Sequence, residues 1–309
     1  MNPAYSVIFF TTASGAGYGL LALLGFVGFN HGLASSMAFA LISVVIALGL
    51  ISLGLLSSTL HLGRPERFWR AFSQWRSSWL SREGVVAVAT YPVALGFGAA
   101  WSGLIGAPQW IAPLGILCAA MCAATVFCTA MIYASLKTIR AWNTTLTVCV
   151  YLAFAIAGGA TLLTAIATAF GRFQIFQVIL ALAAVILVAV LKFFYWRKVD
   201  HAPRVHTMES ATGLGSLGSV NQWEVPHTAQ NFIQKEMGYI VARRHAEVLR
   251  RFVLGLLVLA VVFLLIAVRL PLFSLPAAAV VLVATAIERW LFFAEAQHVV
   301  QLFYGAKSA

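Results

Sequence analysis

Residues 37–60 read MAFALISVVIALGLISLGLLSSTL, a run of apolar and small residues without a charged side chain. An α-helix needs about 20 such residues to cross the roughly 30 Å of bilayer hydrocarbon. The apolar residues would surround this helix on all sides, without the period-2 alternation that is typical of a transmembrane strand. The run therefore predicts a membrane-spanning α-helix.

Seven further runs are similarly long and predominantly apolar. We expect an all-α, polytopic membrane protein, in which residues 1–309 form a single domain, a bundle of eight transmembrane helices. The predicted spans are Val7–Phe29, Met37–Leu60, Gly84–Ile105, Trp110–Ser135, Leu146–Phe170, Phe173–Trp196, Phe252–Val268 and Pro276–Val300.

The composition of the whole chain excludes a soluble protein. Hydrophobic residues make up 61% and charged residues 9%, against about 45–50% and about 25% in soluble domains. The formal net charge is +11, which would suit nucleic-acid binding in a soluble protein. In a membrane protein such an excess more often reports topology, so no nucleic-acid partner is expected.

The positions of the cations predict how the bundle is oriented. Of the 20 Lys and Arg residues, Arg172 and Arg269 fall on one side of the alternating spans and Arg289 falls within the last span. All the others, Lys192 among them, are assigned to the side that carries both termini. Cytoplasmic loops carry the excess of Lys and Arg, so both termini are expected in the cytoplasm. The first Lys or Arg of the chain is Arg64, so the first span is expected to be retained rather than cleaved as a signal peptide.

Two connections between the spans are long, residues 61–83 and residues 198–251. The second has the composition of a soluble protein and is predicted to be a large cytoplasmic insert for partner contact. Its GLGSLG run lacks the Lys-Ser/Thr ending of a phosphate loop, so a flexible linker is expected there, followed by a helix over Asn231–Arg251.

The positions of the cysteines and histidines argue against a metal or haem cofactor bound by this chain. The four cysteines, Cys118, Cys122, Cys128 and Cys149, lie in predicted spans and are expected to be buried core residues without a metal. A haem would need axial ligands at matching depth, and only His61 and His298 could pair. Single histidines at helix ends more often make hydrogen bonds, so a haem is the less favoured interpretation.

Residues 61–83 read HLGRPERFWRAFSQWRSSWLSRE, the stretch richest in polar chemistry. Gly63 and Pro65 are typical of a helix end and a helix start. Phe68, Phe72 and Trp75 would then share one face of a short helix that lies in the membrane interface, with basic residues toward lipid phosphates.

An interfacial helix does not explain the two ends of this stretch. His61 and Glu83 would lie near the same leaflet boundary, and a carboxylate that enters a span usually marks a proton or ligand path. The alternative is that Arg82 simply neutralises Glu83.

The last predicted span contains the neighbouring charges Glu288 and Arg289. Glu288 would lie about 18 Å along the helix from its outer end, at a depth near that of His61 and Glu83. Because sequence neighbours do not share a helix face, each charge is expected to pair with a different helix. An ion-pair lock between helices is favoured over a direct ligand role.

A His, a carboxylate, arginines and aromatic residues at one boundary suit a quinone. Its tail would lie in lipid, its ring would pack against aromatic side chains, and its carbonyl oxygens need hydrogen-bond donors. Quinone reduction takes up two protons for two electrons, and His and Glu side chains can relay those protons.

The run HLGRPERFWRAFSQWRSSWLSRE closely resembles the corresponding loop of the membrane anchor subunits of dimethyl sulfoxide reductase. The resemblance extends to the eight spans and to the aromatic-rich turn Arg289–Phe293. It implies an anchor subunit of a complex iron–sulfur molybdoenzyme in the bacterial inner membrane. The implied partners are a four-cluster iron–sulfur subunit and a molybdopterin catalytic subunit, which would carry all the metal cofactors.

The resemblance also implies roles for residues of this chain. The family's quinone-site His and Glu match His61 and Glu83, and haem is absent from these anchors. The candidate quinone-binding residues are His61, Arg64, Trp79, Ser81, Arg82 and Glu83. Glu288 and Arg289 are candidate supporting residues, and the partner interface is expected to include Arg67, Arg70, Arg76, Arg243 and Arg244.

Two features distinguish branches of this family. The predicted orientation puts the 61–83 loop in the cytoplasm, whereas the dimethyl sulfoxide reductase anchor has it on the periplasmic face. The insert SATGLGSLGSVNQWEVPHTAQNFIQKEMGYIVARRHAEVLRR and the opening MNPAYSVIFFTT are similar to the sulfite dehydrogenase branch. A non-catalytic subunit that passes electrons to quinone during sulfite oxidation is therefore expected. The alternatives are an anchor that oxidises menaquinol for S- or N-oxide reduction and, more remotely, a secondary transporter.

Overall fold

The computed structural model describes residues 3–28, 36–59, 64–202, 206–224, 241–304 and 306. Eight of its helices are long and apolar enough to cross a membrane, and the described residues contain no β-strand. The predicted all-α, eight-span class is confirmed. The spans are α1 (Tyr5–Val27), α2 (Met37–Thr59), α3 (Trp79–Trp101), α4 (Ile111–Ala134), α5 (Thr145–Ala169), α6 (Ile175–His201), α9 (Val241–Ala267) and α10 (Ser274–Ala294).

Short helices lie between and after the spans. They are η1 (Pro65–Phe72), η2 (Pro108–Trp110), α7 (Met208–Thr212), η3 (Gly215–Leu217), η4 (Pro271–Phe273) and η5 (Val299–Tyr304).

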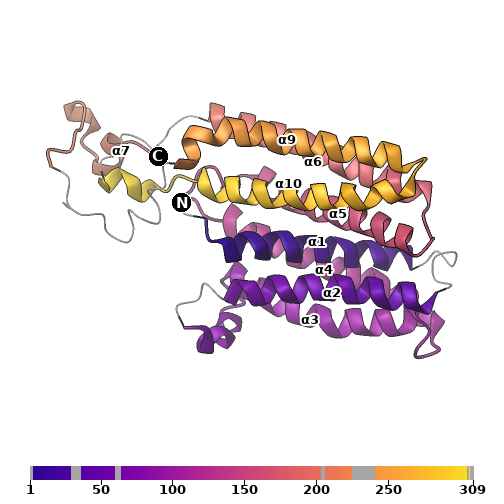
Figure 1. Ribbon diagram of the computed structural model, residues 1–309. Coiled ribbons are helices and arrows are strands. Elements are labelled where there is room, and N and C mark those ends of the chain that lie inside the picture. The colour runs from indigo at the N-terminus through magenta and orange to yellow at the C-terminus, as the bar shows by residue number, and fades with distance from the viewer. Residues whose placement is uncertain are drawn as a thin grey trace.

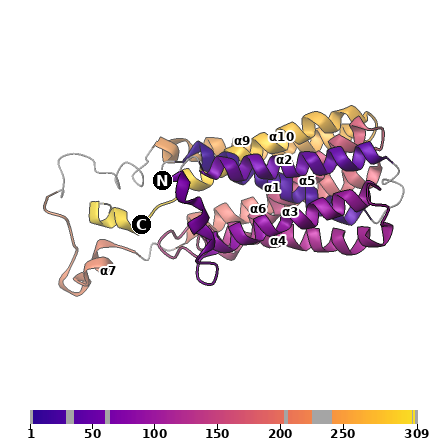
Figure 2. The same cartoon turned by 90° about the horizontal axis from the view of Figure 1, so that it is seen from below.

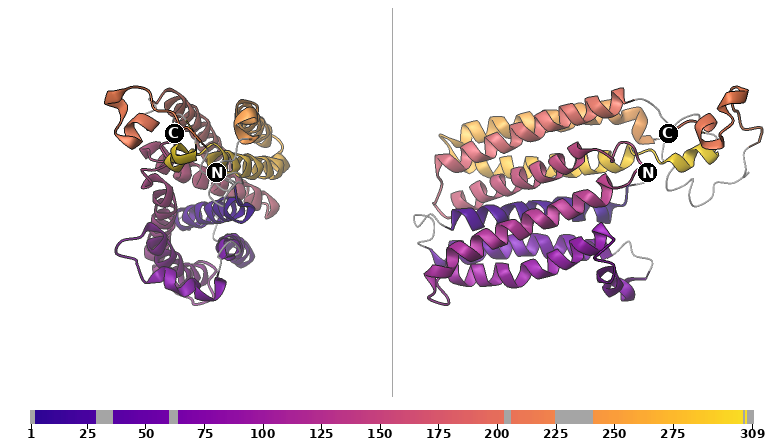
Figure 3. Two further views of the ribbon diagram at one scale, coloured as in Figure 1. Left: turned by 90° about the vertical axis from the view of Figure 1, so that its left-hand side faces the viewer. Right: turned by 180° about the vertical axis from the view of Figure 1, so that it is seen from behind.

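The spans form two groups of four, visible in Figures 1 and 3. In the first helix group, α1–α4, each helix packs against two others: α1 and α3 both contact α2 and α4. In the second helix group, α5 and α9 both contact α6 and α10. The two groups meet where α5 packs against α1 and α4 and where α10 packs against α1. The interface between the groups is therefore built mainly from α1, α4, α5 and α10.

Glycine permits the closest of these contacts. A Cβ atom added at Gly19 of α1 would overlap the carbonyl group of Ala155 on α5, and one added at Gly159 would overlap the Gly19 backbone. Without a driving force from water, helices in lipid associate through such close packing. Gly19 and Gly159 therefore join the two groups backbone to backbone.

The longer connections between the spans gather at one end of the bundle, while η2 and η4 belong to short turns at the other end (Figure 1). The start of α1, η1, α7 and η5 all lie at the first of these ends, as Figures 1 and 2 show. The loops after α2, α4 and α6 thus share an end with both termini of the described chain, as the alternating spans require. We refer to it as the η1 end.

Several predicted boundaries shift by one to three turns. Helix α3 begins at Trp79 rather than Gly84, so Glu83 lies within the span. Helix α10 ends at Ala294, before the predicted Val300, and His298 lies beyond it. Helix α9 already begins at Val241, so the described part of the segment predicted as a separate helix is continuous with the seventh span.

Two local predictions are wrong, the helical face that includes Trp75 and the burial of Cys149. The helix after Gly63 is a 3₁₀-helix that ends at Phe72, so Trp75 does not share a helical face with Phe68. The GLGSLG run, predicted as a flexible linker, follows α7 and contains η3, and α7 packs against η5. Cys149 is exposed, whereas the other three cysteines are buried as expected.

Candidate functional site

Ser81 and Arg82 fix the loop after η1 onto the first turn of α3. The Ser81 hydroxyl donates to the Ala71 carbonyl and accepts from the Gln74 N–H (3.2 Å). Arg82 donates from Nε to the Trp75 carbonyl (3.0 Å) and from Nη2 to the Arg76 carbonyl (2.7 Å). Both side chains therefore hold the loop, and Ser81 is buried.

Arg82 does not neutralise Glu83. Besides its two carbonyl acceptors, the Arg82 guanidinium lies over the Trp79 ring, with Cζ 4.3 Å from the ring centroid. Among the described residues no cation forms an ion pair with Glu83, although its side chain is only 4% exposed. Arg82 is therefore not the ion-pair partner of Glu83.

Glu83 instead binds a hydroxyl on α4. Thr129 Oγ1 donates a hydrogen bond to Glu83 Oε1, and this is the one hydrogen bond that the Glu83 carboxyl makes to the described residues. Trp79 lies four residues before Glu83, on the same face of α3. Its ring packs edge-on against Phe127 of α4, with centroids 5.8 Å apart. Helices α3 and α4 thus bring together a carboxyl, a hydroxyl and two aromatic rings.

A second polar cluster lies in the second helix group. The Lys192 ammonium of α6 is 2.7 Å from Glu288 Oε1, and the two side chains are 1% and 0% exposed. The predicted pairing of Glu288 with another helix is confirmed. Lys192, counted above with the cations on the side of both termini, lies inside α6, nine residues before that helix ends at His201.

Arg289 pairs differently from the prediction. Its Nη1 lies 3.4 Å from Glu288 Oε2, so the two sequence neighbours do contact each other. Arg289 also stacks on another helix, because its Cζ lies 3.6 Å from the centroid of the Tyr151 ring on α5.

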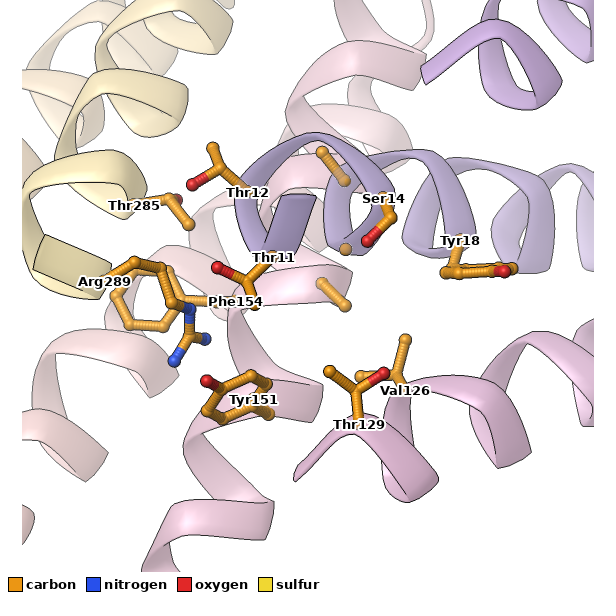
Figure 4. Close-up of a pocket in the computed structure, with 13 residues that line it drawn as sticks. Thr11, Thr12, Ser14, Tyr18, Val126, Thr129, Tyr151, Phe154, Thr285 and Arg289 are labelled. Atoms are coloured by element: carbon orange, nitrogen blue, oxygen red, sulfur yellow. The ribbon is translucent and has the colours of Figure 1, made fainter. Parts of the chain in front are cut away.

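A small cavity lies between these two clusters, at the interface of the two helix groups. Its volume is about 10 Å³, roughly the space of one water molecule. Figure 4 shows Arg289 and Tyr151 at one part of its wall and Thr129 and Tyr18 at another. Thr129 therefore contacts both Glu83 and the cavity.

The predicted histidines fall outside these clusters or outside the described residues. His61 belongs to the part of the chain that is not described. His298 lies between α10 and η5, where its Nδ1 accepts a hydrogen bond from the Val300 N–H (3.0 Å). Burial lowers the pKa of the His298 imidazole below its ordinary value.

The predicted interface arginines all lie at or near the η1 end. Arg70 and Arg76 lie over the Trp69 and Trp75 rings, at 5.7 and 5.5 Å from the ring centroids. Arg64, which is a candidate quinone-binding residue and not one of the interface arginines, is exposed just before η1. Arg67 Nε is 3.9 Å from Glu66 Oε1. Arg243 and Arg244 belong to the first turn of α9.

Three residues of this arrangement were absent from the predicted site: Thr129, Tyr151 and Lys192. A lysine within an apolar span was itself a signal, because such residues are rare and usually paired. Thr129 and Tyr151 carry no comparable signal, since buried threonines and tyrosines are common in these spans.

A family model for the DMSO reductase anchor subunit (DmsC) matches residues 1–306. The chain belongs to this family. It is also 31% identical to a sulfite dehydrogenase subunit from Allochromatium vinosum, over 98% of this chain and 99% of the relative. Both predicted resemblances are confirmed, and the protein is a multi-pass membrane anchor subunit.

Proposed function

We propose that this anchor subunit binds quinone beside Glu83 and passes electrons to it from an iron–sulfur partner during the oxidation of sulfite to sulfate. The observation that carries the proposal is a buried carboxyl with no cation beside it among the described residues. Placing a carboxyl inside a membrane costs free energy, and ionisable residues found there usually mark a functional site. The identity to a sulfite dehydrogenase subunit supports the choice of substrate.

The residues around Glu83 fit a quinone. Glu83 Oε1 accepts from Thr129, which leaves Oε2 for a quinone oxygen. Trp79 and Phe127 offer ring faces and edges at the same height of α3 and α4, and Phe127 is 40% exposed on the outside of the bundle. A quinone ring could pack there with its tail in lipid. Ser81 is unsuited to a direct ligand role, because its hydroxyl is already engaged with the loop.

Proton transfer is the chemical step that this chain would supply. Reduction of a quinone takes up two electrons and two protons, and the electrons would come from the iron–sulfur clusters of the partner. A protonated Glu83 would give its proton to the quinone oxygen bound at Oε2 and then regain one. Thr129 would hold the carboxyl in place in both states. By the family resemblance, His61 is the second proton donor.

Partners would assemble at the η1 end. We propose that a four-cluster iron–sulfur subunit and a molybdopterin catalytic subunit bind there, in contact with the interface arginines and the 198–251 insert. The cation excess of this end supports a cytoplasmic location in a bacterial inner membrane. A reporter fused after Ala309 should therefore behave as cytoplasmic, and an externally active reporter would reverse the orientation.

The quinone site is tested in the intact complex with Glu83→Gln. Sulfite-dependent quinone reduction should fall at least about tenfold, as for removal of a general acid, while reduction of a soluble dye by the catalytic subunit stays unchanged. Glu66→Gln is the matched control, because Glu66 is an exposed carboxyl on η1. Unchanged quinone reduction in Glu83→Gln, with the partners bound, would remove Glu83 from the site.

An anchor that oxidises menaquinol for S- or N-oxide reduction is the second candidate, and the family description favours it. The same complex distinguishes the two, since sulfite should reduce quinone in one case and a sulfoxide should oxidise quinol in the other. A transporter is disfavoured, because each of the eight described spans is one uninterrupted helix rather than a broken one.

A further inference from the structure

The cavity between the two helix groups has a wall of unusual polarity for the interior of a membrane protein. Its side chains come from four spans: α1, α4, α5 and α10. A void of this kind stays dry when its wall is apolar, whereas a polar void needs two to four partners to hold a water molecule.

Part of the wall offers hydrogen-bond acceptors. The hydroxyl hydrogens of Thr11, Ser14 and Thr285 are used within their own helices, on the carbonyls of Val7, Phe10 and Val281 at 2.9, 2.6 and 2.7 Å. Each hydroxyl oxygen still has a lone pair to offer. All three residues line the cavity.

Another part of the wall offers donors without acceptors. Nε of Arg289 and the hydroxyl of Tyr151 are buried and make no hydrogen bond to any described residue, and Nη1 of Arg289 has only its 3.4 Å ion-pair contact with Glu288 Oε2. Arg289 is 1% exposed and Tyr151 is 4% exposed. A buried donor that lacks an acceptor costs about 1–3 kcal/mol. Donors and acceptors therefore meet around one void without pairing with each other.

The charges near the cavity do not cancel within the second helix group. Arg289 and Lys192 are cationic and share the single carboxylate of Glu288. Among the described residues the wall itself carries no acidic side chain. Across it, Thr129 leads to Glu83, a carboxyl that has no cation of its own among the described residues.

Thr129 is suited to connect Glu83 with the cavity in both protonation states. Its Oγ1 is close to Glu83 Oε1 and lies 3.0 Å from the Thr125 carbonyl, and one hydroxyl hydrogen can serve only one of them. With a carboxylate, Thr129 donates to Glu83. With a carboxylic acid, Glu83 donates to Thr129, whose own hydrogen turns to the Thr125 carbonyl.

We propose that one water molecule occupies the cavity and links Thr129, and through it Glu83, to Tyr151 and Arg289. Tyr151 and Arg289 donate to this water, which donates in turn to the hydroxyl oxygens of the wall. Arg289 is then the remote cationic partner of Glu83 across the interface of the two helix groups. Thr129 and Tyr151 are positioning residues. The inference rests on the place of Glu83 in the fold and does not require that quinone binds there.

The link is tested by infrared difference spectroscopy between low and high pH on the full chain with its partners in lipid nanodiscs. The carboxyl bands of Glu83 are assigned by their loss in Glu83→Gln, and the water is assigned by the shift of its O–H stretching band in H₂¹⁸O. Tyr151→Phe removes one donor and keeps the ring under Arg289. It should shift both the water band and the Glu83 carboxyl bands.

Two variants at Thr129 complete the test. Thr129→Val should shift the Glu83 bands and abolish their response to Tyr151→Phe, whereas Thr129→Ser should retain both. Thr161→Val is the control, because Thr161 is a buried threonine of α5 that lies outside the cavity wall. Absence of a band that shifts in H₂¹⁸O, or Glu83 bands unmoved by Tyr151→Phe, would overturn the proposal. If quinone reduction persisted in Glu83→Gln, only the quinone site at Glu83 would be rejected. The spectral changes expected for the water link would still hold.

Discussion

Lys192 and Glu288 form an ion pair 2.7 Å long between α6 and α10, and neither side chain is more than 1% exposed. The Lys192 Nζ also lies 4.1 and 4.4 Å from the ring centroids of Tyr195 and Trp196. Removing one member leaves a buried charge alone, which costs about 3–5 kcal/mol, whereas replacing both by apolar residues is often close to neutral.

We therefore expect Lys192→Met to lower the stability of the purified protein by about 3 kcal/mol or more. The added change Glu288→Leu should not restore it fully, because Arg289 would then lose its carboxylate. Thermal inactivation in detergent and the yield of folded protein measure both effects. A single variant as stable as the parent would show that the pair is dispensable.

Gly19→Ala should disrupt the interface between the two helix groups. The added Cβ would overlap the Ala155 carbonyl, which belongs to rigid backbone and cannot rotate away. Overpacking of this kind costs about 1–3 kcal/mol. Gly49→Ala is the control, because nothing lies within 4 Å of a Cβ at that position of α2. Equal thermal stability of the two variants would contradict the close approach of α1 and α5.

Arg82→Gln should loosen the loop between η1 and α3. The variant loses two hydrogen bonds from a charged donor to the Trp75 and Arg76 carbonyls, worth about 1.5–3 kcal/mol each at most. Hydrogen exchange over residues 64–78, followed by mass spectrometry, should become faster. Arg67→Gln should leave exchange unchanged, because Arg67 makes only a 3.9 Å contact with an exposed Glu66.

The fold of the 206–224 segment should depend on pH. The Glu209 carboxylate accepts hydrogen bonds from its own backbone N–H, from the Thr207 hydroxyl and from the Val220 N–H at 3.1 Å, and these bonds lower the pKa of Glu209 below its usual 4.5. Because the pKa of Glu209 is lower in the folded segment than in the unfolded chain, the ionised carboxyl stabilises the fold at pH values above the unfolded-state pKa. This stabilisation is lost as the pH falls through the lower, folded-state pKa. Protection of the Val220 amide from hydrogen exchange should therefore disappear in acid.

Glu209→Gln provides the control for this pH dependence. It removes the titrating group, so the amide protection of Val220 should be weaker than in the parent near neutral pH and should no longer vary through the acid range. A parent protein whose Val220 exchange shows no acid transition, after correction for intrinsic rates, would be inconsistent with the Glu209 contact.

The spans could be predicted from the sequence because lipid imposes a simple rule, whereas the family was recognised from the run HLGRPERFWRAFSQWRSSWLSRE. Every stretch that crosses the bilayer must be about 20 residues long and apolar, and this constraint is local. Glu83 became a candidate site residue by the same rule, since a carboxyl that enters such a stretch is conspicuous.

The partners of the polar groups could not be predicted, because pairing depends on which helices meet. Lys192 and Glu288 are 96 residues apart in the chain. The role of Thr129 depends on the contact of α3 with α4, and in sequence it resembles threonines that bond only to their own helix, such as Thr90 and Thr161. The exclusion of Arg82 as partner of Glu83 depended on the carbonyl groups of a loop that has no periodic pattern.

The order of the spans has a consequence for biosynthesis. The first helix group consists of the four spans that leave the ribosome first, so it can close before the second group exists. Helix α10 is the eighth span, and it brings both Glu288 and Arg289. A translation product that stops short of Ser274 could fold its first half and carry Glu83 and Thr129, yet it would lack the positive side of the cavity. The polar residues around the cavity can therefore come together only after all eight spans have been inserted.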